Sequence, residues 1–135
     1  LSIVKPDGVS KNLIGEVIKR FEGRGLKVMG LKMIWMDKKE AEGFYVVHRG
    51  KHFYESLTVF MSSWPSVVIV LEGDGAISKT RELMGATDPQ KAEQGTLRRQ
   101  FATNIERNIV HGSDAPETAA FEIGYFFNAL EMFSY

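Results

Sequence analysis

Short apolar runs alternate with amphipathic segments along the chain, which predicts strands separated by helices. The clearest strand is the run SVVIVLEG at 66–73. A first short strand, LSIVK at 1–5, is ended by Pro6, and a long strand rich in Val, Met, Ile and Trp covers 26–36. A last short strand is predicted at 108–110.

Helical spacing of apolar residues is clearest at 13–21, and Gly23 and Gly25 end that helix. Asp37 and Glu40, three residues later, predict a capping box for a helix that continues to about Val47. Further helices are expected at 53–61, at 77–84 and, after a polar loop at 85–95, as a short turn near 97.

The last helix is predicted from a similar start signal, in which Asp114 and Glu117 cap its first turn. Its inner face is expected to consist of Ala119, Ala120, Ile123, Phe127 and Leu130.

The predicted order is strand, helix, strand, helices, strand, helix and loop, strand, helix. Two βαβ halves of this kind indicate an α/β (α+β) fold, the ferredoxin-like βαββαβ sandwich with a four-stranded antiparallel sheet covered by helices. No internal repeat, low-complexity tract or linker divides the chain, so residues 1–135 are expected to form a single domain.

Charge and composition exclude several classes of protein. Lys plus Arg and Asp plus Glu both number 17, so the basic excess typical of nucleic-acid and anionic-membrane binding is absent and no specific nucleic acid is expected. The apolar runs are far shorter than the ~20 residues that span a bilayer, so no membrane partner is expected. The absence of cysteine excludes thiolate chemistry and fits a reducing compartment, for which we expect the cytoplasm.

One of the three histidines stands out by its position. Most lone histidines are structural, and His48 and His52, at a helix end and in a loop, take that interpretation. His111 instead ends a predicted strand, next to Gly112, which allows close backbone approach, and before a helix start that favours anions. A neutral imidazole is nucleophilic at pH 7, so His111 is a candidate carrier of a phosphoryl group.

Phosphoryl transfer also requires cations and hydrogen-bond donors directed at phosphates. Lys5 at the end of the first strand, Arg81 in a helix, Thr87 in the polar loop and Arg98 are candidates. Together with His111 they form a candidate phosphate clamp, although their convergence depends on the tertiary structure.

Two other motifs are excluded. GDGAISKT at 73–80 follows a strand, but Ser78 stands where both the P-loop and the dinucleotide fingerprint require glycine, so an ordinary strand-to-helix turn is expected. EGFYVVH at 42–48 lacks the basic residue that begins the aromatic strand of an RNA-recognition motif, and the capping box upstream makes it helical.

From Leu1 to about Phe127 the chain closely resembles nucleoside diphosphate kinases. The segments that match the family's order and spacing are IVKPDGV, KNLIGEVIKRFE, EAEGFYVVH, VLEG, RELMGATDP, GTLR and NIVHGSD. The combination of KPD with a downstream NxxHGSD is highly specific to that family.

The resemblance implies a ping-pong mechanism in which His111 takes the γ-phosphate of a nucleoside triphosphate and passes it to a nucleoside diphosphate. The δ nitrogen of the ring would carry the phosphate, while the other nitrogen is held by backbone. Glu122 would orient the imidazole with help from Ser113.

The resemblance also implies the nucleotide contacts. Lys5 and Asn108 would meet the ribose 3′-hydroxyl, and Lys5, with Tyr45 nearby, the transferring phosphate. Arg81, Thr87 and Arg98 would hold the phosphates.

Phe53 would stack on the base, with Ile105 near its other side. Mg²⁺ would bridge the phosphates and arrive with the nucleotide, so the chain is expected to carry no metal ligands of its own. The family also implies a homo-oligomer, a tetramer or hexamer built from dimers.

Three positions depart from the family pattern without touching the catalytic residues. Arg99 and Gln100 stand where many members have a small residue followed by aspartate, and Trp64 replaces a glycine before Pro65. These departures concern surface contacts or assembly. Two alternative functions remain open at this point, a phosphohistidine carrier protein and a non-catalytic nucleotide-binding module.

Overall fold

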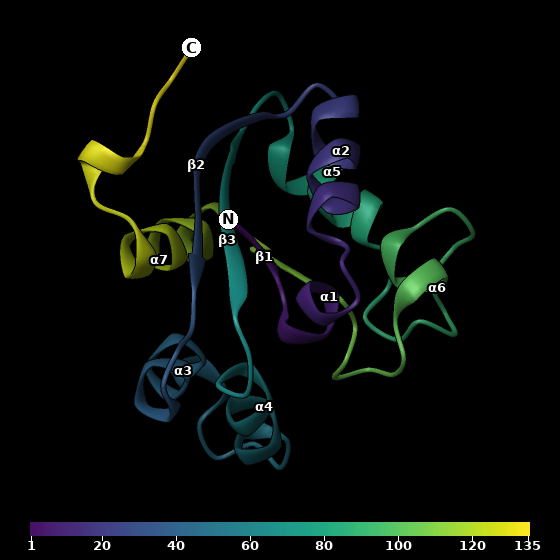
Figure 1. Ribbon diagram of the computed structural model, residues 1–135, viewed down its shortest axis with the longest axis vertical. Coiled ribbons are helices and arrows are strands. Elements are labelled where there is room, and N and C mark those ends of the chain that lie inside the picture. Colours follow the sequence, from purple (N-terminus) through teal and green to yellow (C-terminus); the bar gives the residue numbers. More distant parts are fainter.

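The computed structural model describes residues 1–135 and contains one four-stranded antiparallel sheet (Figure 1). Its strands are β1 (Ser2–Val4), β2 (Lys27–Ile34), β3 (Ser66–Glu72) and β4 (Val110–Gly112). They lie in the order β2-β3-β1-β4, with helices between β1 and β2 and between β3 and β4. This is the ferredoxin-like arrangement, and the predicted fold is confirmed.

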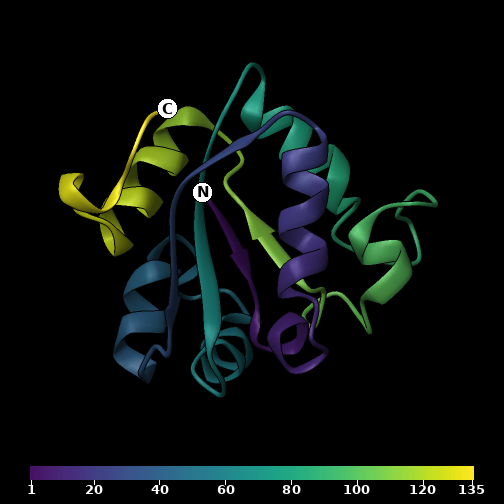
Figure 2. The same cartoon turned by 45° about the horizontal axis from the view of Figure 1, so that its top comes forward.

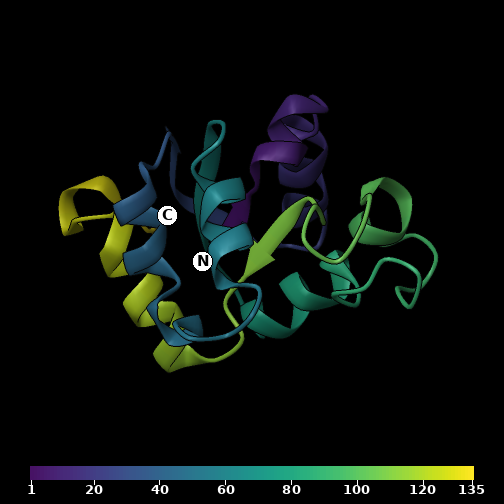
Figure 3. The ribbon, with the colours of Figure 1, turned by 90° about the horizontal axis from the view of Figure 1, so that it is seen from below.

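Helices cover both faces of the sheet (Figure 3). On one face lie α3 (Lys38–Phe44), α4 (Tyr54–Met61) and α7 (Pro116–Phe126). On the other lie α1 (Pro6–Ser10), α2 (Ile14–Gly23), α5 (Ala76–Met84) and α6 (Leu97–Phe101). Two single 3₁₀ turns complete the chain, at Val46–His48 and Ala129–Glu131.

The two hydrophobic cores are separated by the sheet. Val68 and Val70 of β3 pack against α3, α4 and the end of α7, whereas Val67 and Ile69 pack against α2, α5 and α6. Because side chains alternate between the faces of a strand and both faces are covered, β3 needs an uninterrupted apolar run. This explains why it was the clearest strand in the sequence.

The capping box before α3 is present as predicted. The Asp37 carboxylate accepts from the Glu40 backbone N–H at 2.8 Å, and the Glu40 carboxylate accepts from the Asp37 N–H at 2.9 Å. The α-helix ends at Phe44 rather than near Val47, and the next residues form the 3₁₀ turn at Val46–His48. The segment 42–48 is therefore helical, not a strand.

Pro6 does more than end the first strand. It occupies the first turn of α1, where a residue without an N–H is favoured, and this helix was not predicted. The helix brings Gly8 against the chain before β4, where an added Cβ would lie 2.9 Å from the Ile109 carbonyl oxygen.

The last strand was predicted two residues too early. It covers Val110–Gly112, because Ile109 has a φ of 76° and leaves the extended conformation. His111 therefore lies in the middle of β4, opposite Ile3 of β1, instead of at a strand end.

The predicted capping of the last helix by Asp114 and Glu117 is wrong. The helix begins at Pro116 after an Ala115 N-cap that makes no side-chain bond, and Asp114 accepts instead from the Thr118 hydroxyl at 2.8 Å. The predicted inner face was also partly wrong, because Ala120 and Leu130 are exposed. The helix ends at Phe126, so its periodicity does not continue to 130.

The segment after α7 returns along β2 (Figure 2). The Phe133 N–H donates to the Met29 carbonyl at 2.9 Å, and Glu131 pairs with Lys32 at 3.0 Å. Phe127 packs on Gly30, where an added Cβ would lie 2.9 Å from its ring. None of the helices has the length and apolar character required to cross a membrane.

Candidate active site

A cavity of about 650 Å³ opens between β4, the helices α3 and α7, and the loops before α4 and after α5. Every predicted site residue lines it except Ser113, which is buried behind His111. The lining residues from the prediction are Lys5, Tyr45, Phe53, Arg81, Thr87, Arg98, Ile105, Asn108, His111 and Glu122. Residues separated by more than a hundred positions in the sequence thus surround one space.

The position of His111 follows from the register of β4. Its partner is Ile3, whose side chain belongs to the core on the α3 and α7 side, so the imidazole faces the same side. There it meets the edges of two rings, Phe44 at a centroid distance of 5.4 Å and Tyr45 at 6.0 Å. Packing on these two aromatic rings limits rotation of the imidazole.

Glu122 of α7 fixes the orientation of the imidazole. His111 Nε2 lies 2.8 Å from Glu122 Oε1, and the Ser113 hydroxyl donates to the same oxygen at 2.7 Å. An ionised carboxylate only accepts hydrogen bonds, so Nε2 carries the ring hydrogen. Nδ1 therefore keeps its lone pair and is the ring nitrogen available to act as a nucleophile.

The expectation that backbone holds the other ring nitrogen is wrong in this chain, because the Glu122 carboxylate bonds Nε2. Burial by itself would raise the pKa of Glu122, but the hydrogen bonds from His111 and Ser113 outweigh it and hold the pKa below its ordinary value. The carboxylate is consequently ionised at neutral pH and able to stabilise positive charge on the ring.

Lys5 is a buried amine in the floor of the cavity. Its Nζ donates to the Glu106 carbonyl at 2.7 Å and to Asn108 Oδ1 at 2.8 Å. Burial lowers the pKa of Lys5 to about 8, partly opposed by the nearby Asp7 carboxylate. An ammonium group that has lost most of its water interacts strongly with an anion such as phosphate.

The Arg98 guanidinium is hydrogen-bonded to the protein backbone, so only part of it is free to bind phosphate. Its guanidinium donates to the carbonyls of Val110 at 2.8 Å, Gly85 at 3.0 Å and Asn108 at 3.3 Å. Burial, with Arg81 nearby, lowers the pKa of Arg98 to about 10. A guanidinium has five donors, so Arg98 keeps donors for a ligand while it holds the backbone on both sides of Ile109.

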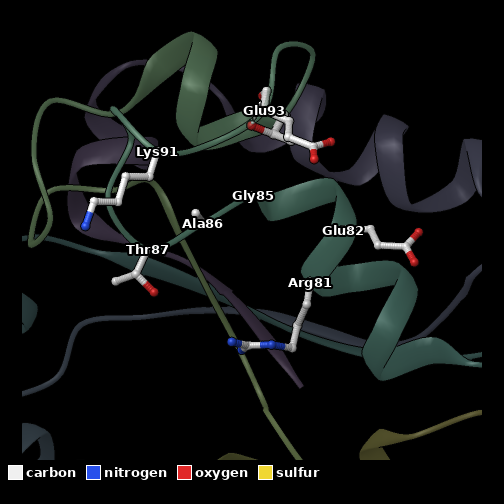
Figure 4. A pocket seen from close by; sticks show the side chains of 8 residues that line it. Arg81, Glu82, Gly85, Ala86, Thr87, Lys91 and Glu93 are labelled. Carbon is white, nitrogen blue, oxygen red and sulfur yellow. Dashed lines mark hydrogen bonds between the residues drawn. The ribbon is translucent and has the colours of Figure 1, made fainter.

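Arg81 and Thr87 lie on α5 and the loop that follows it. From α5, the side chains of Arg81 and Glu82 point in opposite directions (Figure 4). Arg81 and Thr87 also line an adjacent hollow of about 570 Å³. The Asn108 amide donates to the Thr87 carbonyl at 3.2 Å and so connects this loop to β4.

At the mouth of the cavity lie Phe53, Ile105 and two further histidines. His48 contacts the Phe53 ring edge to face, with centroids 5.2 Å apart, and stacks on Tyr45 at 6.1 Å. Ile105 is 63% exposed, so a flat ligand entering between it and Phe53 would cover apolar surface on both sides.

Three contributors were not predicted from the sequence. Phe44 packs on His111, the Glu106 backbone carbonyl binds Lys5, and Asp7 binds the Ile109 backbone. A backbone carbonyl has no sequence signal. Asp7, by contrast, lies in the segment IVKPDGV, two residues after Lys5, and that adjacency was a usable signal.

No group of three or more His, Asp or Glu side chains is arranged to hold a metal ion. The carboxylates that line the cavity belong to Glu106, Asp114 and Glu122. Glu122 is bonded to His111 and Ser113, Asp114 to Thr118, and Glu106 to Ser56.

Comparison with known proteins identifies the family of the chain. The family model for nucleoside diphosphate kinase matches residues 1–132. The chain is 64% identical to the nucleoside diphosphate kinase of Desulforapulum autotrophicum over 132 residues, covering 98% of this chain and 96% of that one. It is 65% identical to that of Desulfosudis oleivorans over 132 residues, covering 98% and 95%.

Solved structures give the same result. The nucleoside diphosphate kinase of Aquifex aeolicus superposes with a TM-score of 0.95 at 41% identity, covering 98% of this chain and 96% of that one. The Halobacterium salinarum enzyme, solved in complex with CDP, superposes with a TM-score of 0.95 at 38% identity, covering 99% and 90%. The chain therefore belongs to the nucleoside diphosphate kinase family.

Proposed function

We propose that His111 is the residue through which this chain, as a nucleoside diphosphate kinase, passes the γ-phosphate from a triphosphate to a diphosphate. The observation that carries the proposal is the bond between His111 Nε2 and Glu122 at 2.8 Å. It leaves Nδ1 as the nucleophile in a cavity lined by Lys5, Arg81 and Arg98.

The reaction has two half-reactions that are each other's reverse. In the first, Nδ1 of His111 forms a bond to the γ-phosphorus, and the bond from that phosphorus to the β–γ bridging oxygen breaks, which releases a nucleoside diphosphate. In the second, a terminal β-phosphate oxygen of the acceptor diphosphate attacks the phosphohistidine and the N–P bond breaks. The Glu122 carboxylate stabilises the positive charge that the ring gains on phosphorylation.

The proposed phosphate ligands are Arg81, Thr87 and Arg98, with Lys5 and Tyr45 beside the transferred group. Burial and the Glu122 charge raise the pKa of Tyr45, so its phenol stays protonated and can donate to a phosphate oxygen. The bond between Lys5 Nζ and Asn108 Oδ1 supports a joint role of these two residues at the ribose 3′-hydroxyl.

The proposed base site consists of Phe53 and Ile105 at the cavity mouth. Stacking on an aromatic face suits every base, since each base has a π-face. The CDP bound to the Halobacterium salinarum relative fits a site that takes a pyrimidine nucleotide.

Mg²⁺ fits this site as an ion carried by the nucleotide. The carboxylates at the cavity are bonded to neighbouring side chains, so phosphate oxygens and water would supply most ligands. When bound, the ion neutralises phosphate charge, while Lys5, Arg81 and Arg98 orient the phosphates towards His111.

Label transfer tests the proposal against its two alternatives. The protein is incubated with γ-labelled ATP, freed of nucleotide and then given GDP. Label that moves to protein in an acid-labile, base-stable form and then to GTP supports the proposed reaction. Label that stays on the protein until another protein is added indicates a carrier, and absence of label indicates a binding module.

We further propose that the protein is a homo-oligomer, a tetramer or hexamer built from dimers, and that a second copy covers an apolar patch beside the edge strand β2. The patch consists of Leu31, Met33, Trp35 and Trp64, each 49% to 60% exposed. Trp35 and Trp64 pack together with ring centroids 5.7 Å apart. Apolar surface grouped at the edge strand of a sheet is typical of an interface between chains.

Native mass spectrometry of the wild type and of Met33→Glu tests the assembly. We expect a tetramer or hexamer for the wild type and smaller species for Met33→Glu. Phe121→Glu, which places the same charge on an exposed apolar residue of α7, is the matched control. A monomeric wild type would contradict the proposal.

A further inference from the structure

The backbone is strained two residues before the proposed nucleophile. Ile109 has a φ of 76°, in the left-handed region that a β-branched residue rarely adopts. The Val110 N–H donates to the Asn108 carbonyl at 2.9 Å, so 108–110 form a γ-turn of the rare type with positive φ. Such strain persists only where the surrounding structure holds it, and it concentrates at functional sites.

The turn determines which side chains reach the cavity. In an uninterrupted strand, Asn108 and Val110 would share one face and Ile109 and His111 the other. Val110 belongs to the core on the α2 side, so Asn108 would point away from the imidazole. Because the turn breaks this alternation, Asn108 and His111 line the same cavity, and Ile109 is fully buried in the α2 core.

The Asp7 side chain and the Lys5 backbone are both hydrogen-bonded to this turn. Its Oδ2 accepts from the Ile109 backbone N–H at 3.0 Å, which is the only hydrogen bond of its side chain. The Lys5 backbone N–H donates to the Ile109 carbonyl at 2.8 Å. Both polar groups of the strained residue are thus bound by the segment Lys5–Asp7, a hundred positions earlier in the chain.

Burial of the Asp7 side chain costs free energy of folding, so its position calls for a compensating role. The residue is 6% exposed, and its second carboxylate oxygen, Oδ1, is buried without a hydrogen-bond partner. A buried carboxylate with one unpaired oxygen is unfavourable for the fold by itself. A carboxylate that accepts from a backbone N–H nevertheless makes a stronger bond than a neutral acceptor does.

We propose that Asp7 is a positioning residue of the phosphoryl transfer: by holding the strained turn at Ile109, its carboxylate presents Asn108 and His111 to the same cavity. This inference rests on the proposed role of His111. Asp7 does not line the cavity and acts only through the backbone.

The experiment measures the single-turnover rate of His111 phosphorylation by γ-labelled ATP, together with the Kd of ATP, in Asp7 variants. Asp7→Ala should slow phosphorylation by ~10–100-fold, because a displacement of about 1 Å at a reacting group costs that much. The Kd should change less, since the phosphate ligands on α5 and its loop remain in place.

Two further variants separate the hydrogen bond from the charge. Asp7→Asn keeps an oxygen that can accept from the Ile109 N–H, so it should recover most of the rate. Asp7→Glu keeps the charge but adds a methylene that displaces the carboxylate, so it should be slow. Asp37→Ala is the matched control, because it removes the same kind of bond at the start of α3, away from the cavity. It should lower the Tm and leave the rate unchanged.

An Asp7→Ala protein that folds and is phosphorylated at the wild-type rate would overturn the inference. A slow Asp7→Asn combined with a fast Asp7→Glu would do the same, because charge and not the bond would then be responsible. If Asp7→Ala and Asp7→Glu do not fold, a slow Asp7→Asn is sufficient to reject it. Failure of the proposed function is distinct, since the wild type itself would then take no label.

Discussion

The contact between His111 and Glu122 allows one perturbation to be worked out in detail. Glu122→Gln keeps the length of the side chain and removes its charge. The carboxylate oxygen that it replaces accepts from His111 Nε2 at 2.8 Å and from the Ser113 hydroxyl at 2.7 Å. Both the His111 and Glu122 side chains are mostly buried, at 21% and 8% exposed, so water screens the pair only in part.

The expected effect follows from the change of charge on the ring. When Nδ1 takes the phosphoryl group, the imidazole becomes more positive, and the bond to a carboxylate strengthens more than the bond to an amide. A hydrogen bond to a charged group contributes about 1.5–3 kcal/mol, so phosphorylation of Glu122→Gln should be slower by roughly 10- to 150-fold. The binding of ATP, which does not alter the ring charge, should change little.

Quenched-flow measurement of single-turnover phosphorylation, with ATP affinity from calorimetry, provides the assay. Ser113→Ala is the comparison, because it removes the second hydrogen bond to the same oxygen but keeps the carboxylate charge, and it should reduce the rate less. A wild-type rate for Glu122→Gln would refute the assignment of Glu122. A loss confined to ATP affinity would show that the residue acts in binding and not on the imidazole.

Three further predictions concern the other site residues. His111→Gln should abolish both phosphoenzyme formation and transfer while ATP binding by calorimetry stays nearly intact, and label on that variant would contradict the assignment. Because burial lowers the pKa of Lys5 to about 8, kcat/KM should fall as the pH rises through about 8 and Nζ loses its proton, and Lys5→Arg, which stays charged, should remove this fall. Phe53→Ala should weaken binding of ADP, GDP, CDP and UDP by a similar ~1–3 kcal/mol each, whereas a loss for one base alone would reveal a contact that reads base identity.

Local interactions allowed much of the fold to be predicted from the sequence. The apolar run of β3 predicts a strand because its residues must be buried on both faces. The capping box of Asp37 and Glu40 involves residues three apart and needs no tertiary partner. The segment NIVHGSD indicated the family, which the comparisons confirm, and made His111 the candidate nucleophile.

Contacts between distant segments decided features that were mispredicted. Extended geometry at 108–110 was expected from β-branched residues, but Ile109 has a positive φ, and both its N–H and its carbonyl are hydrogen-bonded to the segment Lys5–Asp7 at the other end of the chain. One mispredicted feature was local: α7 begins at Pro116 and not after Asp114, since a residue without an N–H suits the first turn.

The convergence of the site was likewise a tertiary result. Types of residue suited to bind phosphate were visible in the sequence, but only the sheet order places Lys5 of the first segment beside β4. The engagement of Arg98 with three carbonyls could not be inferred, because backbone acceptors leave no trace in the sequence. Sequence therefore determined which chemical groups were available and which local elements they belonged to. Tertiary structure decided which of those groups meet, because long-range pairing and burial outweigh local preference wherever the two disagree.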